Sequence, residues 1–264
     1  MKIAISQLIT SLMPVKELAE KAQAAGYDGV ELLLSPDNTE LNYGTTDAEL
    51  QDIRSVFSER SLEIYSVVVS SKSGNLLASG EAANDAIGNA VHGLETASKL
   101  GAKVILHTLG RLSPELYYED AYNNAIANLK VVAKSAEKTG VALAIEFVWN
   151  GFLFSPLEMR NLLDAVGSEG IGFYFDPGNM AVFQYPQHWV RALGHYTKHV
   201  HLKDWKGGAL SGEWTALLKG AVDFPTVMRE LHAAGYAGPL VSEVSPSLAS
   251  WEETAKTMRQ IAAM

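Results

Sequence analysis

The chain has 264 residues, 47% of them hydrophobic, and a formal net charge of −9 at pH 7. This length suits one large domain of the α/β-barrel kind or two ordinary domains. The negative charge and the lack of any run of lysines and arginines argue against a nucleic-acid-binding protein. Zero cysteines exclude a disulfide framework and a thiolate zinc site, so any metal ion must be held by nitrogen and oxygen ligands.

The N-terminal segment MKIAISQLIT is too short and too interrupted by polar residues for a secretory signal. No apolar run reaches the roughly 20 residues that a membrane span needs. We therefore expect a soluble, cytoplasmic protein without a membrane partner, and a homo-oligomer is compatible with the sequence.

Short apolar strands alternate with amphipathic helices along the chain. The predicted strands are Lys2–Gln7, Gly29–Leu34, Glu63–Val69, Lys103–Leu109, Ala142–Phe147, Ile171–Phe175, Lys198–Lys203 and Pro239–Val244. The first predicted helix begins at Pro14 and closes at Gly26, and the others are Asp47–Ser61, Glu81–Leu100, Tyr117–Thr139, Ser155–Val166, Pro186–Tyr196, Phe224–Ala234 and Trp251–Ala263. Glycines 26, 101 and 140 stand where helices should end.

Eight strand–helix units in about 250 residues predict a (β/α)₈ TIM barrel. No linker or low-complexity tract interrupts them, so we expect a single domain over residues 1–264. An open doubly wound sheet is the alternative, but no G-x-G-x-x-G motif follows the first strand. The longest irregular stretches, Ser70–Gly80 and Asp204–Asp223, follow the C-terminal ends of strands and are candidate lids.

Four consecutive strands end in side chains that bind metals well. These are Glu146 in ALAIEF, Asp176 in GFYFDPGN, His201 in KHVHLKDW and Glu243 in PLVSEV. In a barrel, the C-terminal strand ends surround the mouth of the active site. Three carboxylates facing one another would repel unless a cation lay among them. The sequence thus predicts one divalent metal bound by these four residues, and we expect Mn²⁺, with Mg²⁺, Co²⁺ or Zn²⁺ as alternatives.

Three further polar residues lie on the predicted strands. Glu31, in GVELLL, is expected to hydrogen-bond substrate, the alternative being a salt bridge to a neighbouring strand. His107, in VILHTLG, could meet a substrate hydroxyl or be a satisfied barrel histidine. His199 lies two residues before His201, on the same side of the strand but one layer deeper, so we expect it to support the site or pack in the core.

Residues that follow the strand ends are candidates for substrate contacts. Trp149 and Asn150 come soon after Glu146 and could supply an apolar wall and an amide donor. Lys203 and Asp204 extend the His201 strand and could orient substrate or neutralise each other.

The order and spacing of these motifs resemble the xylose isomerase-like barrel superfamily, which includes ketose and sugar-phosphate 3-epimerases, inosose and dehydroshikimate dehydratases, and endonuclease IV. The resemblance spans nearly the whole chain and rests on GVEL, AIEF, DPGN, HVHLKD, GAVDF and VSEV. It implies the same four metal ligands, and it implies that Glu146 and Glu243 are the pair of catalytic carboxylates.

The departures from the family pattern indicate which members of the superfamily this chain resembles most. Free-ketose epimerases similar to the tagatose and psicose enzymes have a histidine and an arginine where this chain has Asn179 and Gly207. The D-x-G-N and H-x-H-x-K-D forms look more like pentulose- or hexulose-phosphate 3-epimerases or inosose dehydratases, which makes Asn179 a candidate substrate contact. Endonuclease IV needs extra histidines, including a D-x-H pair, and this chain lacks that pair.

Together these features predict a metal-dependent epimerase or isomerase of a ketose or ketose phosphate. One carboxylate removes the proton next to the carbonyl and the other returns a proton to the opposite face of a cis-enediolate held on the metal. The alternatives are a metal-dependent dehydratase or lyase acting on a keto-cyclitol or keto-sugar, and a sugar-binding barrel without catalytic activity.

Overall fold

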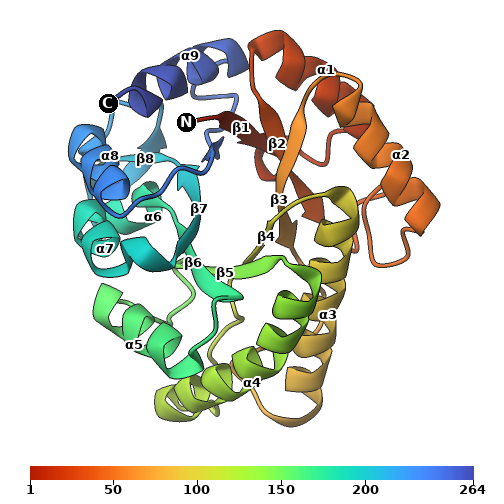
Figure 1. Ribbon diagram of the computed structural model, residues 1–264. Coiled ribbons are helices and arrows are strands. Elements are labelled where there is room, and N and C mark those ends of the chain that lie inside the picture. Colours follow the sequence, from red (N-terminus) through yellow and green to blue (C-terminus); the bar gives the residue numbers. More distant parts are fainter.

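The structure is a computed structural model that describes residues 1–264. Eight parallel strands form a closed barrel, and these strands are β1 (Ile3–Ser6), β2 (Gly29–Leu34), β3 (Glu63–Val69), β4 (Val104–His107), β5 (Ala142–Glu146), β6 (Ile171–Phe175), β7 (Thr197–Leu202) and β10 (Leu240–Ser242). The ring closes because β1 pairs with β2 on one side and with β10 on the other (Figure 1). The predicted (β/α)₈ barrel is confirmed, and the strand ends differ from the prediction by at most a few residues.

Helices surround the barrel on its outer side, as Figure 1 shows. They are α1 (Val15–Ala25), α2 (Asp47–Ser58), α3 (Gly80–Leu100), α4 (Tyr118–Thr139), α5 (Pro156–Val166), α7 (Pro186–Leu193), α8 (Phe224–Ala233) and α9 (Trp251–Ala262). Local sequence sets their ends: Gly26, Gly101 and Gly140 are left-handed C-caps, and Thr46 and Ser250 form capping boxes. None of the helices has the length and apolar character needed to cross a membrane.

Three short helices were not predicted as separate elements. They are η1 (Gln7–Ile9), α6 (Pro177–Ala181) and η2 (Gly194–Tyr196). The predicted helix over 186–196 ends at Leu193 and continues as η2. The helix α6 matters most for the site, because its N-cap is the candidate metal ligand Asp176, whose side chain accepts the N–H of Asn179.

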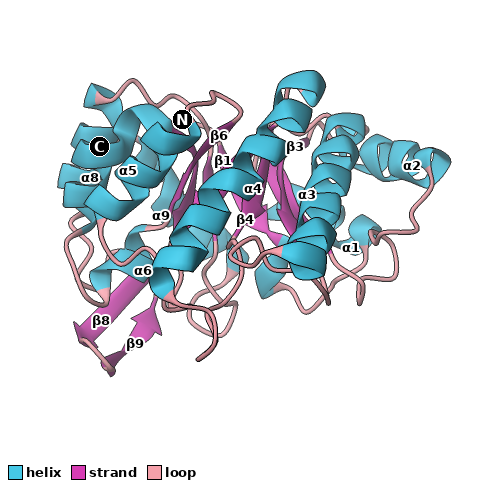
Figure 2. Cartoon of the chain, turned by 90° about the horizontal axis from the view of Figure 1, so that it is seen from below, coloured by secondary structure: helices cyan, strands magenta, loops and turns pink.

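The stretch after β7 differs from the prediction of an irregular loop. Strands β8 (Asp204–Gly208) and β9 (Ser211–Thr215) pair as an antiparallel hairpin, which extends away from the barrel in Figure 2. The carboxylate of Asp204 anchors its base, accepting the backbone N–H groups of Trp205, Gly220 and Val222 at 3.0, 2.8 and 3.1 Å. The sequence prediction missed the hairpin because its strands lack a clear alternation of apolar residues.

The apolar core lies between the strands and the surrounding helices, and it brings α3 very close to β3. At Gly93, in the middle of α3, an added Cβ would lie 2.5 Å from Cγ2 of Val69. At Gly88 in the same helix, an added Cβ would meet nothing within 4 Å. The packing of α3 against the end of β3 therefore needs glycine at position 93 but not at position 88.

This difference predicts opposite effects for two otherwise equivalent substitutions. Gly88→Ala should stabilise the protein by about 0.5–1 kcal/mol, since alanine favours the helix and has room. Gly93→Ala should destabilise it by about 1–3 kcal/mol, because the new methyl group must push α3 away from Val69. Urea unfolding of both variants tests this expectation, and equal effects of the two substitutions would contradict the close packing.

Candidate metal centre and active site

The four predicted metal ligands come from four adjacent strands. Glu146 ends β5, Asp176 directly follows β6, His201 lies in β7, and Glu243 directly follows β10. One ligand atom from each of them lies within 4.8 Å of all the others. Glu146, Asp176 and His201 are buried, and the side chain of Glu243 is 18% exposed. The barrel thus brings together three carboxylates and one imidazole at the carboxyl ends of its strands.

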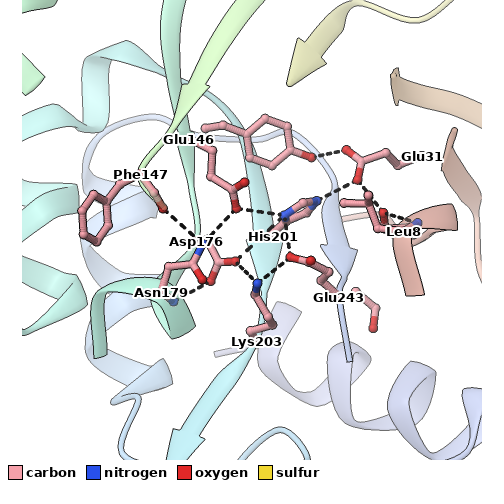
Figure 3. A network of polar contacts seen from close by, with 12 residues as sticks. Leu8, Glu31, Glu146, Phe147, Asp176, Asn179, His201, Lys203 and Glu243 are labelled. Atoms are coloured by element: carbon pink, nitrogen blue, oxygen red, sulfur yellow. Dashed lines mark hydrogen bonds and ion pairs between the residues drawn. The ribbon is translucent and has the colours of Figure 1, made fainter. Parts of the chain in front are cut away.

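His201 lies at the centre of this group, as Figure 3 shows. Its Nδ1 is 3.2 Å from Oε2 of Glu243, 3.4 Å from Oε1 of Glu146 and 4.0 Å from Oδ2 of Asp176. Its Nε2 is 2.7 Å from Oε1 of Glu31. Because an ionised carboxylate can only accept, Nε2 carries a proton and donates it to Glu31. Nδ1 is then the nitrogen that faces the carboxylates and can offer a lone pair to a metal.

Glu31, the expected substrate contact, holds the imidazole of His201 in place in this structure. Its carboxylate is fully buried and also accepts hydrogen bonds from Ser6 Oγ and Ser66 Oγ, both at 2.7 Å, and from the hydroxyl of Tyr174. Although burial alone would raise the pKa of Glu31, the neighbouring His201 lowers it to about 2. The side chain points into the barrel and accepts four hydrogen bonds there, so the structure favours a role in orienting His201, and a contact with substrate stays a prediction.

Asn179 likewise supports the ligands from α6. Its Nδ2 donates to Oε1 of Glu146 and to the carbonyl of Phe147, both at 3.1 Å, and its backbone N–H donates to Oδ1 of Asp176 at 3.0 Å. Since both amide hydrogens are used within the protein, Asn179 orients two of the four ligands. A substrate contact by this side chain would need its carbonyl oxygen.

Lys203 places a positive charge beside two of the carboxylates. Its Nζ is 2.7 Å from Oε2 of Glu243 and 3.1 Å from Oδ2 of Asp176, and it lies 4.8 Å from the ring centre of Trp214. The alternative in which Lys203 and Asp204 neutralise each other does not occur, because Asp204 turns toward the base of the hairpin. Lys203 is therefore close enough to the cluster to contact a bound ligand.

The two glutamates have different proton affinities although both are buried. Burial raises the pKa of Glu146 to about 7, and the charges of Glu243 and Asp176 add to this effect. Burial alone would also raise the pKa of Glu243, but Lys203 and His201 lower it to about 2. The pKa of His201 lies well above its ordinary range, because Glu31 and the other acids outweigh its burial. In the metal-free protein the imidazole is thus protonated at neutral pH.

These residues fit a divalent cation. The donor set is three carboxylates and one imidazole nitrogen, which suits Mn²⁺, Mg²⁺, Co²⁺ and Zn²⁺ better than softer metals. Oδ2 of Asp176 is buried without a hydrogen-bond partner, although Lys203 pairs with it electrostatically. A divalent ion together with the Lys203 ammonium would balance the charge of the three carboxylates.

Two hollows flank the cluster. A cavity of about 620 Å³ is lined by Glu146, by His107 and by the loops after β3 and β4. A smaller hollow of about 210 Å³ is lined by Glu243, Lys203 and Trp214 among others. The larger cavity falls in the usual size range of small-molecule sites. Each glutamate therefore faces its own side of the open space.

His107 has the properties expected of a hydroxyl-binding residue. Burial lowers its pKa to about 4, so the ring is neutral at pH 7. Its Nδ1 accepts the backbone N–H of Leu109 at 2.9 Å, which leaves the proton on Nε2. Because His107 lines the larger cavity, a role as a donor to substrate is consistent with the structure and stays a prediction.

Trp149 and Asn150 have separate roles. Trp149 is 46% exposed, donates from Nε1 to the carbonyl of Asn179 at 3.1 Å, and stacks on Trp214 with 5.2 Å between ring centres. It thus extends an aromatic wall beside the site. Asn150 differs from the expected amide donor, because its Nδ2 already donates to the carbonyls of Thr108 and Gly110.

The sequence predicted no role in the site for Trp214 or Tyr174. Trp214 reaches the site only through the unpredicted hairpin, where it lies opposite Trp205. Tyr174 had a usable signal, since it lies two residues before Asp176 and so on the same side of its strand.

Metal binding should depend on pH through these shifted pKa values. In the metal-free protein a proton is held on His201 and, below pH 7, a second one on Glu146, and the metal must displace both. We expect the apparent Mn²⁺ affinity to fall by about tenfold or more for each pH unit below 7, and to keep rising less steeply above pH 7 as long as His201 holds its proton. Isothermal titration calorimetry in buffers of different ionisation enthalpy measures the affinity and the proton release together.

Glu146→Gln is the control for this prediction, because glutamine has no proton to release. Its Mn²⁺ affinity should be lower but should depend less steeply on pH between 5 and 7. A wild-type affinity that does not change over this range would contradict the buried proton on Glu146.

Known proteins share this fold over its full length. Among solved structures, a D-tagatose 3-epimerase-like protein superposes with a TM-score of 0.84 at 18% sequence identity, covering 100% of this chain and 97% of its own. The 3-keto-D-glucoside 4-epimerase YcjR from E. coli gives a TM-score of 0.79 at 15% identity and 100% coverage of both chains. At such low identities these comparisons establish the fold.

A curated relative is the probable L-ribulose-5-phosphate 3-epimerase UlaE of Mycoplasma pneumoniae, which is 24% identical over 167 residues, or 61% of this chain and 54% of that protein. The chain therefore matches about half the length of this relative. A family model described as the xylose isomerase-like TIM barrel matches residues 19–261. The chain belongs to the xylose isomerase-like TIM barrel family.

Proposed function

We propose that this protein is a divalent-metal-dependent epimerase or isomerase of a ketose or ketose phosphate. The observation that carries the proposal is the pair of buried glutamates, Glu146 and Glu243, which lie on either side of His201 and line two different hollows. A reaction that removes a proton from one face of a carbon and adds one to the other face needs two such groups. The names of the three similar proteins described above, two epimerases and one epimerase-like protein, agree with this chemistry.

The chain's own residues prepare the two carboxylates for proton transfer. Lys203 and His201 keep Glu243 ionised, so it can accept a proton. Glu146 has a pKa of about 7 in the metal-free protein, close to the value that suits a group which both gains and loses a proton near neutral pH. Asn179 holds the Glu146 carboxylate in place through Nδ2, and His107 can donate from Nε2 to a substrate oxygen.

A divalent ion in this centre, for which we propose Mn²⁺, would supply a Lewis acid that stabilises the negative charge developing on the substrate oxygens. The predicted cis-enediolate belongs to this proposal, as do the cytoplasmic location and the homo-oligomer. Trp149 and Trp214 form the aromatic wall that limits access of water from the side of the hairpin.

A second candidate function is a dehydratase or lyase that uses the same residues. It is favoured by the high proton affinity of Glu146, because a carboxylate that removes the proton next to the carbonyl can pass it on to a departing hydroxyl group. The product distinguishes the two reactions: an unsaturated ketone absorbs in the ultraviolet, whereas an epimer has the mass and absorbance of its substrate. A third hypothesis is a sugar-binding barrel without catalytic activity, which would release every sugar unchanged.

The test is a screen of free and phosphorylated pentuloses and hexuloses with Mn²⁺ in D₂O. We expect at least one ketose to be epimerised at C3, with one deuterium at that carbon in the product. A turned-over ketose without deuterium at C3 would contradict the two-base scheme.

Substitution of each glutamate tests whether it acts as a proton acceptor as well as a metal ligand. Glu146→Gln and Glu243→Gln each keep an oxygen ligand but remove one proton acceptor, so each should lower kcat by about 10²–10⁴-fold. Each variant should retain exchange of the α-proton of a single epimer, because one base still serves one face. If both variants epimerise at the wild-type rate with metal bound, the glutamates are ligands alone and the mechanism is wrong.

A further inference from the structure

The larger cavity carries positive charge that a neutral sugar would not need. Its charged lining residues are Glu146 at the metal centre and two cations, Lys72 and Arg111, on the loops after β3 and β4. This is a local excess of positive charge in a protein whose net charge is −9. The two cations and the reacting carboxylate thus line one cavity of about 620 Å³, which is open to solvent on one side.

Both cations are available to a ligand. Arg111 has no carboxylate within the 4.0 Å that defines an ion pair, and its guanidinium makes no hydrogen bond to the protein. Lys72 is 2.7 Å from Oδ1 of Asp37, with both side chains about two-thirds exposed. Exposed pairs of this kind are weak, so an incoming anion can replace Asp37 as the partner of Lys72.

The loop that carries Arg111 is fixed from both sides. Asn75, on the loop after β3, donates from Nδ2 to the carbonyl of Arg111 at 2.7 Å. Asn150, on the loop after β5, donates to the carbonyls of Thr108 and Gly110 at 3.0 and 2.8 Å. These bonds explain why the amide of Asn150 is not free for substrate: it holds the backbone beside Arg111.

Gly110 shows how closely this loop is packed. Its φ angle is +133°, in the region that only glycine adopts readily, and an added Cβ would lie 2.0 Å from Oδ1 of Asn75. The backbone before Arg111 therefore has one well-defined path. A fixed backbone lowers the cost of ordering the guanidinium when a ligand binds.

We propose that the substrate carries an anionic oxygen group, a phosphate ester or a carboxylate, at the end remote from the reacting carbon, and that Arg111, assisted by Lys72, binds it. The guanidinium donates two parallel N–H bonds to such a group, which a neutral hydroxymethyl end cannot accept equally well. This inference rests on the proposed function, because it uses Glu146 to place the reacting end of the sugar in the same cavity.

The first experiment compares matched substrates in the Mn²⁺-loaded protein. A ketose, its terminal phosphate ester and the corresponding keto-uronate are assayed with wild type and with Arg111→Ala. We expect the wild type to have a higher kcat/KM for one of the two anionic substrates than for the free ketose. In Arg111→Ala the ratio of these two kcat/KM values should fall by about 10- to 100-fold, mainly through KM. The substrate whose ratio falls shows whether the bound group is a phosphate or a carboxylate.

The control is Arg229→Ala, which removes an exposed arginine from α8, a helix that does not line this cavity. This variant should keep the wild-type ratio of kcat/KM for the anionic substrate to kcat/KM for the free ketose. Arg111→Lys keeps the charge but not the paired N–H donors, so it should fall between wild type and Arg111→Ala. An Arg111→Ala variant with the same ratio as Arg229→Ala would overturn the proposal and leave the epimerase function untouched.

A second experiment does not depend on turnover. Calorimetric titration of the Mn²⁺-loaded proteins with inorganic phosphate should show binding to wild type and Arg229→Ala, weakened at least about tenfold in Arg111→Ala. If phosphate binds this way but no ketose is turned over, the anion site stands and the epimerase function fails. If all three proteins bind phosphate equally, the anion binds elsewhere and the inference is wrong.

Discussion

The burial of three carboxylates around one imidazole is the constraint on which this structure depends. Glu146, Asp176 and Glu243 converge on Nδ1 of His201 at the carboxyl ends of adjacent strands, where little solvent screens their mutual repulsion. In the metal-free protein the Lys203 ammonium and a proton on Glu146 relieve part of this repulsion. A divalent cation would displace that proton and neutralise the carboxylates together with Lys203, which is why the cluster is better explained as a metal centre than as a structural salt-bridge network.

The geometry of this centre is tied to the closure of the barrel. Glu31 on β2 receives hydrogen bonds from Ser6 on β1, Ser66 on β3 and Tyr174 on β6, and it fixes the ring of His201 on β7. Residues on five of the eight strands therefore determine which imidazole nitrogen faces the carboxylates. Supporting carboxylates of this kind set the orientation of metal-binding histidines and increase their basicity. The proposed anion contact lies instead in the loops, where Asn75 and Asn150 donate to backbone carbonyls of Arg111 and Gly110.

The sequence was sufficient to predict the barrel and to bring the four candidate ligands together, because both follow from regular periodicity and from the rule that sites form at carboxyl ends of strands. The sequence was not sufficient to predict which groups the individual polar side chains hydrogen-bond. Glu31 and Asn150 looked like substrate contacts, yet their partners are 25 to 170 residues away for Glu31 and about 40 for Asn150. Such partners become neighbours only when the barrel closes. The hairpin that carries Trp214 was missed for a different reason: its pairing gives no clear period of two in the sequence.

The most direct test of the account is a crystal structure of the protein with Mn²⁺, measured at the manganese absorption edge. The account predicts one anomalous peak bound by oxygens of Glu146, Asp176 and Glu243 and by Nδ1 of His201, with Nε2 of His201 still directed at Glu31. A manganese peak bound at other residues would contradict the account. So would a crystal grown at a saturating Mn²⁺ concentration in which the four side chains surround no metal and Lys203 alone neutralises Asp176 and Glu243.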